Sequence, residues 1–265
     1  MTKQIISFTL LLLTGIFSLQ AADSKPIRIG TNDIDLILKI GDNGRLYQSY
    51  LGERLQSEAD IAFLKQGKEV YLTHGLEEPA IRVLHNDGNP SLLLKYVSHE
   101  NRKIDDNVTE TVITLQDDKY PVEVKLFFTT FAKENIIKER TEIKHQEKKP
   151  ITLYNYASSL LHLNADHYWL TEFSGEWAHE ANMTERQLDF GKKIIDTKLG
   201  VRANMFCSPF FFLSLNQPAR ENEGDILMGT IGWTGNFRFT FEVDNLNGLR
   251  IISSINPHAS EYSLK

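Results

Sequence analysis

The chain has 265 residues, of which 41% are hydrophobic and 24% are charged, a composition typical of a globular protein with a sizeable core. It excludes a disordered, collagen-like or low-complexity chain. With 29 basic and 35 acidic residues the formal charge is -6, so the chain lacks the basic field on which nucleic-acid binding depends. A single cysteine excludes a disulfide framework and any zinc site that needs several thiolates.

Residues 1–22 are predicted to be a secretory signal peptide. Lys3 supplies a positive charge, residues 5–19 form an apolar run too short for a membrane span, and the small residues Ala21 and Ala22 offer a cleavage point. We therefore expect an exported product, in a periplasm or outside the cell, with no membrane contact after cleavage.

Residues 23–265 are predicted to form one domain of many short strands. Residues 35–40 end in a Gly-Asp-Asn-Gly turn and are followed by residues 45–52, which predicts a β-hairpin. Further strand-like runs are 80–84, 91–97, 109–115, 122–130, 136–143, 151–163, 205–215, 225–232, 237–243 and 248–255. No ten-residue segment shows a helical period with caps, and strand spacings of roughly 10–15 residues favour a large antiparallel sandwich over βαβ units. The expected class is all-β, with few short helices.

The densest polar and aromatic stretch is residues 166–188, which contain Trp169 and Trp177. Sugars bind to such mixtures of flat apolar faces and charged planar groups, although two tryptophans in a β domain are also common core residues. A glycosidase needs two facing carboxylates. The acids of this stretch are near one another only in sequence, and a solvated surface explains them better: Glu172, Glu176, Glu180 and Glu185.

Other kinds of site find little support. His162, His167 and His179 are too widely spaced for a two-ligand helical metal motif. Nucleophile-elbow, phosphate-loop and dinucleotide motifs do not occur in the sequence. Cys207 lies between aromatic residues and is expected to be inert packing. No catalytic residue, metal or cofactor is therefore assigned.

The order of several short motifs is more specific than any one of them. They are Ser-Gly-Glu-Trp-Ala-His-Glu at 174–180, Glu-Arg-Gln-Leu at 185–188, Ser-Pro-Phe-Phe-Phe-Leu at 208–213, Gly-Asn-Phe at 235–237 and Ile-Asn-Pro at 255–257. Together with the hairpin at 45–55, this series resembles the N-terminal β-supersandwich domain of the α-galactosidases of glycoside hydrolase family 36. The resemblance covers residues 27–264 and implies a galactose-mutarotase-like fold.

In that family a (β/α)8 barrel follows the sandwich and carries the aspartate nucleophile and the aspartate acid/base. This sequence has neither a comparable strand-end aspartate motif nor βα repeats. The resemblance thus implies a retaining glycoside hydrolase of which this chain holds only the sandwich, truncated near the junction with a missing barrel and inactive alone.

The resemblance also implies two substrate-binding residues. The tryptophan of the Ser-Gly-x-Trp-Ala motif reaches the rim of the galactose pocket and corresponds to Trp177, and an acidic residue after the early hairpin corresponds to Asp60. Where the family often has arginine after the alanine, this chain has His179. The family assembles as a tetramer in which sandwich loops approach a neighbouring barrel.

Three functions follow as hypotheses. The first is a sandwich domain that shapes an α-galactoside pocket and an oligomer interface when a barrel is present. The second is a free-standing carbohydrate-binding module in which Trp177, with Trp169 or Trp233, stacks on sugars. The third is an interaction module that pairs with a separately encoded barrel.

Overall fold

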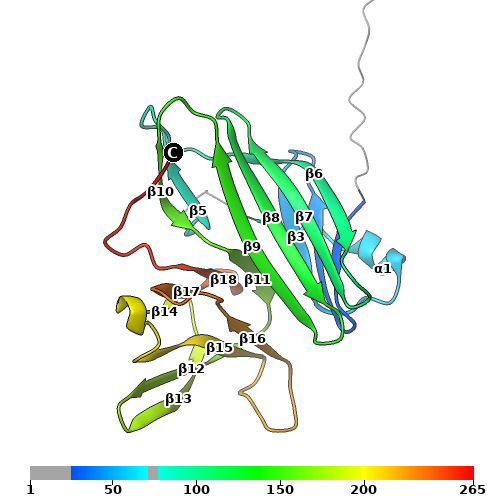
Figure 1. The fold of residues 1–265 in the computed structure, drawn as a ribbon. Coiled ribbons are helices and arrows are strands. Elements are labelled where there is room, and N and C mark those ends of the chain that lie inside the picture. Colours follow the sequence, from blue (N-terminus) through cyan, green and yellow to red (C-terminus); the bar gives the residue numbers. More distant parts are fainter. Residues whose placement is uncertain (1–24, 71–76) are drawn as a thin grey trace, which may run out of the picture.

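The computed structural model describes residues 25–70 and 77–265, and within these ranges the protein is built almost wholly from antiparallel β-strands (Figure 1). The expected all-β class is confirmed. The helical segments are short: α1 (Glu58–Phe63) and the 3-10 turn η1 (Gly200–Arg202). No helix among the described residues has the length and hydropathy of a membrane span. The predicted signal peptide, residues 1–22, lies outside the described residues.

Two four-stranded sheets form the main sandwich. The first has the order β1 (Ile27–Gly30), β2 (Ile34–Ile40), β3 (Leu46–Glu53), β4 (Lys68–Glu69). The second has the order β6 (Leu94–Lys103), β7 (Val108–Asp117), β8 (Val122–Phe131), β9 (Ile136–His145), and Figure 1 shows it in front of the first. Every second residue of β8, such as Val124 and Leu126, is buried between them.

Three further sheets complete the described chain. A small one has the order β19 (Tyr262–Leu264), β10 (Ile151–Tyr156), β5 (Ile81–Leu84). The middle sheet has the order β11 (Ser159–Asn164), β18 (Gly248–Ile255), β17 (Phe237–Val243), β14 (Gly191–Asp196). The hairpin sheet has the order β13 (His179–Leu188), β12 (Tyr168–Glu176), β15 (Cys207–Leu215), β16 (Ile226–Thr230).

Most expected strands are present, with differences that have local causes. The predicted hairpin at 35–52 is β2 and β3, and its turn contains Gly44 at φ 76, a conformation that favours glycine. The run expected at 151–163 is two strands, because the chain leaves the small sheet at Ala157 and enters the middle sheet at Ser159. Six of the described strands were not expected as strands: β1, β4, β12, β13, β14 and β19.

The middle sheet is buried on both faces. Its aromatic face, with Phe237, Phe239 and Phe241, packs against Tyr168 and Leu213 of the hairpin sheet. Its opposite face adds the buried side chains of Leu160 and Ile252 to the core of the main sandwich. This sheet therefore belongs to two cores and holds the two halves of the structure together.

A row of charged and polar side chains crosses the middle sheet on the face toward the main sandwich. The strand register aligns His162, Arg250, Glu242 and Lys192 on β11, β18, β17 and β14. The Arg250 side chain is 2% exposed, and its Nη1 lies 3.0 Å from Glu242 Oε2. Arg250 Nη2 also donates to the carbonyl of Glu78 at 2.7 Å. A buried guanidinium is tolerated only with such partners, because desolvating an unpaired charge is expensive.

Removal of the Arg250 charge should therefore unfold the domain more easily. We expect Arg250→Met to lower the free energy of unfolding by about 3–5 kcal/mol, because Glu242 stays buried without its main partner. Urea unfolding measures the change. The double variant Arg250→Met with Glu242→Gln should be less destabilised than the single one. The control Arg102→Met removes an exposed arginine and should change stability by less than about 1 kcal/mol. A near-native Arg250→Met would show that the row does not stabilise the fold.

The buried histidine of the row predicts a pH dependence of stability. Burial, reinforced by the positive charge of Arg250, lowers the pKa of His162 from 6.5 to about 4. The unfolded chain therefore takes up this proton first, and stability that is fully present above pH 6.5 is lost as pH falls toward 4. The loss should reach about 2–3 kcal/mol. His162→Gln cannot titrate, so unfolding curves from pH 7.5 to 4.5 should lose less stability in this variant than in the wild type.

Candidate functional site

The β12–β13 hairpin presents Trp177 to solvent. Pairing of Glu176 with His179 leaves Trp177 and Ala178 as a two-residue turn, on the left of Figure 1. Ala178 has φ 64, the left-handed conformation found at the second central residue of a type II turn. The indole of Trp177 is 88% exposed. Among the residues that the structure describes, no aromatic ring stacks on it, and its exposure leaves most of the indole open to a partner.

A β-bulge next to this turn sets the direction of the tip. Ser174 pairs with Asn182 and Glu176 with His179, so Gly175 alone lies opposite two residues, Glu180 and Ala181. A Cβ at Gly175 would lie 3.2 Å from the Glu180 Cα, which is backbone and cannot easily yield. Bulges of this kind increase strand twist and redirect the chain end. Close approach of the two strands therefore favours glycine at position 175, whereas the turn itself lies further along, at Trp177 and Ala178.

Side chains of the hairpin hold the tip in place. The Glu180 carboxylate accepts the N–H of Ala178 at 3.2 Å, and the Asn182 amide donates to the carbonyl of His179 at 2.8 Å. These bonds fix both ends of the turn. The site is thus an exposed indole on a braced two-residue turn.

Three of the acids of this stretch, Glu172, Glu180 and Glu185, have partners in the fold, whereas Glu176 is exposed. Glu172 lies 2.8 Å from Lys193 Nζ and 3.0 Å from Arg186 Nη2, so it joins the hairpin sheet to β14 of the middle sheet. Glu185 accepts the N–H of Ala219 at 2.9 Å. These contacts give Glu172 and Glu185 structural roles in positioning the hairpin.

Asp60 lies in α1 and is part of a capping box. Its carboxylate accepts the N–H of Ser57 at 3.2 Å, while the Ser57 hydroxyl accepts the N–H of Asp60 at 3.1 Å. Figure 1 shows α1 beside the sheet of β1 to β4, on the opposite side of the molecule from the β12–β13 turn. The structure therefore does not bring Asp60 and Trp177 together within this chain, and the sugar-binding role of each stays a prediction.

The hairpin sheet has an apolar outer face, which the sequence pattern only partly reveals. Strand register places these side chains on the face turned away from the middle sheet: Trp169, Phe173, Met183, Phe210, Phe212, Ile226 and Met228. Met183 is 68% exposed and Met228 57%. The ring centroids of Phe173 and Phe210 are 4.9 Å apart, and those of Phe173 and Phe212 are 5.7 Å apart with an 80° tilt. Such tilted rings make no flat platform for a sugar, and the outer face is better suited to contact with protein.

The cysteine and the histidines considered as reactive or metal-binding residues do not form a site in the described structure. Partial burial raises the pKa of the Cys207 thiol to about 11, so it stays protonated and a poor nucleophile at neutral pH. His162 is buried in the middle sheet, whereas His179 is exposed at the hairpin tip. Over residues 25–70 and 77–265, His, Cys, Asp and Glu do not gather into a group of three able to hold a metal ion.

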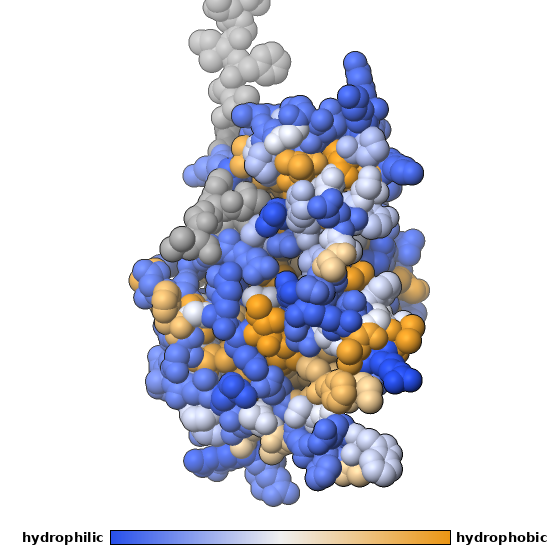
Figure 2. Space-filling view, turned by 90° about the vertical axis from the view of Figure 1, so that its left-hand side faces the viewer, coloured by the Kyte–Doolittle hydropathy of each residue, from blue (hydrophilic) through white to orange (hydrophobic). Residues whose placement is uncertain are grey.

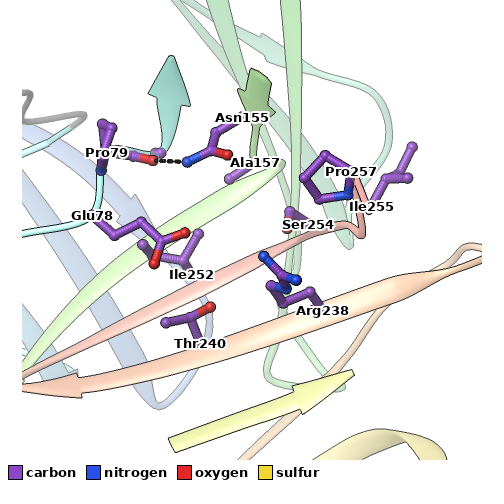
Figure 3. A pocket seen from close by; sticks show the side chains of 11 residues that line it. Glu78, Pro79, Asn155, Ala157, Arg238, Thr240, Ile252, Ser254, Ile255 and Pro257 are labelled. Atoms are coloured by element: carbon purple, nitrogen blue, oxygen red, sulfur yellow. Dashed lines mark hydrogen bonds between the residues drawn. The ribbon is translucent and has the colours of Figure 1, made fainter. Parts of the chain in front are cut away.

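A small void lies between the middle sheet and the segment before β5. Figure 3 shows Arg238, Thr240 and Ser254 on one side, and Asn155 donating to the carbonyl of Pro79 on the other. Its volume is about 10 Å³, which suits a single water rather than a sugar. This small void is therefore not a sugar-binding site.

Seen from the side toward which the hairpin turn points, Figure 2 shows apolar patches set among hydrophilic residues in the lower half of the molecule. The hairpin tip stays the candidate for the galactoside contact.

The described chain forms five antiparallel sheets, and one of them, the middle sheet, is buried on both faces between the others. This arrangement is a β-supersandwich, the class expected from the sequence. Residues 44–265 match the glycosyl hydrolase family 36 N-terminal domain, and the chain belongs to this family. Family membership confirms the resemblance drawn from the motif order.

Similar proteins are α-galactosidases. The chain is 29% identical over 159 residues to alpha-galactosidase 2 of Pediococcus pentosaceus, which covers 60% of this chain and 22% of that enzyme. The crystal structure of the alpha-galactosidase from Lactobacillus brevis superposes with a TM-score of 0.81 at 21% identity, over 90% of this chain and 37% of that one. The structure of an AgaA variant from Geobacillus stearothermophilus in complex with raffinose superposes with a TM-score of 0.81 at 19% sequence identity. The match covers 91% of this chain and 38% of that one. The chain thus spans well under half the length of these relatives.

The turn geometry makes a prediction about stability. Ala178 has φ 64, which costs a residue with a Cβ about 1–2 kcal/mol and costs glycine nothing. We expect Ala178→Gly to raise the free energy of unfolding by up to about 1 kcal/mol after the loss of chain entropy is subtracted. Thermal unfolding measures it. The matched control is Ala219→Gly, at an exposed position with ordinary φ, which should be neutral or destabilising. Equal effects at both positions would contradict the turn assignment.

Proposed function

We propose that this chain is the N-terminal sandwich domain of an exported α-galactosidase-like hydrolase, and that it forms part of the rim of a galactoside pocket through Trp177. Catalysis belongs to a separate (β/α)8 barrel. The observation that carries the proposal is the 88% exposed indole on a braced turn, in a chain of the family 36 N-terminal domain. Exposure of a large apolar side chain to water is unfavourable, so an exposed tryptophan at the tip of a braced turn suggests that a partner covers it.

A single indole suits one wall of a pocket better than a complete sugar site. Stacking of one aromatic ring on a sugar contributes on the order of 1 kcal/mol, which alone corresponds to weak binding of millimolar order or worse. The same energy becomes useful when a second surface holds the sugar in place. Asp60 stays a second predicted contact, since its Oδ2 accepts from Ser57 and Oδ1 is left for a sugar hydroxyl.

The outer face of the hairpin sheet supports a protein partner for this domain. Its methionines and tilted aromatic rings can adapt to an apolar protein surface, which matches a barrel or an oligomer interface. A free-standing sugar-binding module is less well supported, because those rings form no coplanar platform.

Reconstitution tests the proposal. The Lactobacillus brevis enzyme without its N-terminal domain is co-expressed either with that domain, as the positive control, or with this chain. We expect this chain to restore part of the hydrolysis of a nitrophenyl α-galactoside, and to show none when purified alone. Trp177→Ala should raise KM about fivefold, as expected for a loss of about 1 kcal/mol. The matched control Trp233→Ala should leave KM unchanged.

Two results would contradict the proposal. One is turnover by this chain alone that is abolished by Glu172→Gln or Glu176→Gln. The other is reconstitution by the native domain while this chain neither binds the barrel nor restores activity. If this chain alone binds raffinose with a Kd well below about 1 mM, the result would favour the free-standing module instead.

A further inference from the structure

A cavity that is open to solvent lies at one end of the main sandwich, between the edge strand β1 and the sheet of β6 to β9. Its volume is about 220 Å³, far above the roughly 10–15 Å³ that one water needs. Six of the residues that line it are charged or polar: Arg28, Arg54, Asn101, Thr109, Thr111 and Thr130. The cavity is large enough for a small organic ligand, and neither Trp177 nor Asp60 lines it.

The interior of the sandwich changes from apolar to hydroxyl-bearing at this end. Along β7 the buried Ile113 is followed, two residues nearer the cavity, by Thr111, which is 3% exposed, and Thr130 of β8 is 4% exposed. The Thr111 hydroxyl donates to Asn101 Oδ1 at 2.8 Å. The N–H groups of the exposed Asn101 amide and the hydroxyl of the half-buried Thr109 have no protein partner among the described residues, so both are open to solvent or to a ligand. The walls therefore offer hydrogen bonds that a polyhydroxylated ligand can satisfy.

The charge of the cavity comes from Arg54. Arg28 is neutralised by the fully buried Asp35, which accepts from Nε at 3.0 Å and from Nη2 at 2.7 Å. The Arg54 guanidinium donates to the carbonyl of Thr31, and over the described part of the chain it pairs with no carboxylate. The described lining of the cavity contains no acidic residue. The exposed Arg54 side chain thus places one positive charge, with N–H donors that no carboxylate takes up, at the solvent-facing mouth of the cavity.

We propose that this cavity binds a small carboxylate that carries several hydroxyl groups, with a sugar acid as the chemical class. The carboxylate pairs with the Arg54 guanidinium, which favours planar oxyanions, while the hydroxyls bond to Thr109, Thr111 and the Asn101 amide. A neutral sugar leaves the guanidinium charge unpaired, and a simple inorganic anion leaves the hydroxyl-bearing walls unused. The site is independent of the role proposed for Trp177.

A backbone-amide NMR titration of the full chain tests the proposal. D-galacturonate, D-galactose and inorganic phosphate are titrated separately. We expect galacturonate to shift the amides of Thr109, Thr111 and Thr130 saturably, with a Kd at least about tenfold below those of galactose and phosphate. Arg54→Met should weaken galacturonate binding at least about tenfold, and Thr111→Val should weaken it less. The control Arg220→Met removes an exposed arginine elsewhere and should change nothing.

Several results would overturn the proposal. Absence of saturable shifts up to about 20 mM galacturonate means that the cavity is not such a site. Equal affinity for phosphate means a plain anion site, and equal affinity for galactose with no effect of Arg54→Met means a neutral-sugar site. Trp177→Ala should leave galacturonate binding unchanged, so failure here is distinct from failure of the pocket-rim function.

Discussion

The charged row across the middle sheet is the constraint on which the rest of the structure depends. Arg250 is desolvated between two hydrophobic cores and is stable there only because Glu242 and the Glu78 carbonyl are aligned with it. That alignment requires the β11-β18-β17-β14 register to be fixed, since a one-residue slip would carry the row into the aromatic core. With this register fixed, the aromatic face of the middle sheet is the surface on which the hairpin sheet packs. That packing in turn sets the direction of the β12–β13 hairpin.

Much of the fold could be predicted because most strands alternate clearly between buried and exposed positions, as in β8. The exceptions have physical reasons. In β13 nearly every side chain is exposed, so the strand carries little hydrophobic signal, and β14 is short and rich in lysine. The break between β10 and β11 has neither glycine nor proline to mark it in the sequence, and the two partly buried segments belong to different sheets. The six residues of α1 are too few for a helical period, although Ser57 and Asp60 form a cap.

The candidate site was only partly accessible from the sequence. Residues 166–188 were identified by composition, and the structure makes most of them one hairpin with Trp177 at its tip. The outer face could not be read in the same way, because Phe210 and Phe212 alternate with the buried Phe211 and Leu213, and both faces of β15 are apolar. The sugar-acid cavity is assembled from β1, the segment after β3 and three strands of a second sheet, and only tertiary structure brings these together.

The outer face also has a consequence for the behaviour of the separate chain in solution. Its exposed thioethers and phenyl edges are not covered by another element in the described chain, and a formal charge of -6 spread over the whole surface gives only weak colloidal repulsion. Oxidation of Met183 and Met228 to sulfoxides would make this surface more hydrophilic without disturbing the buried cores. The redox history of a preparation would then influence whether the chain stays dispersed or self-associates.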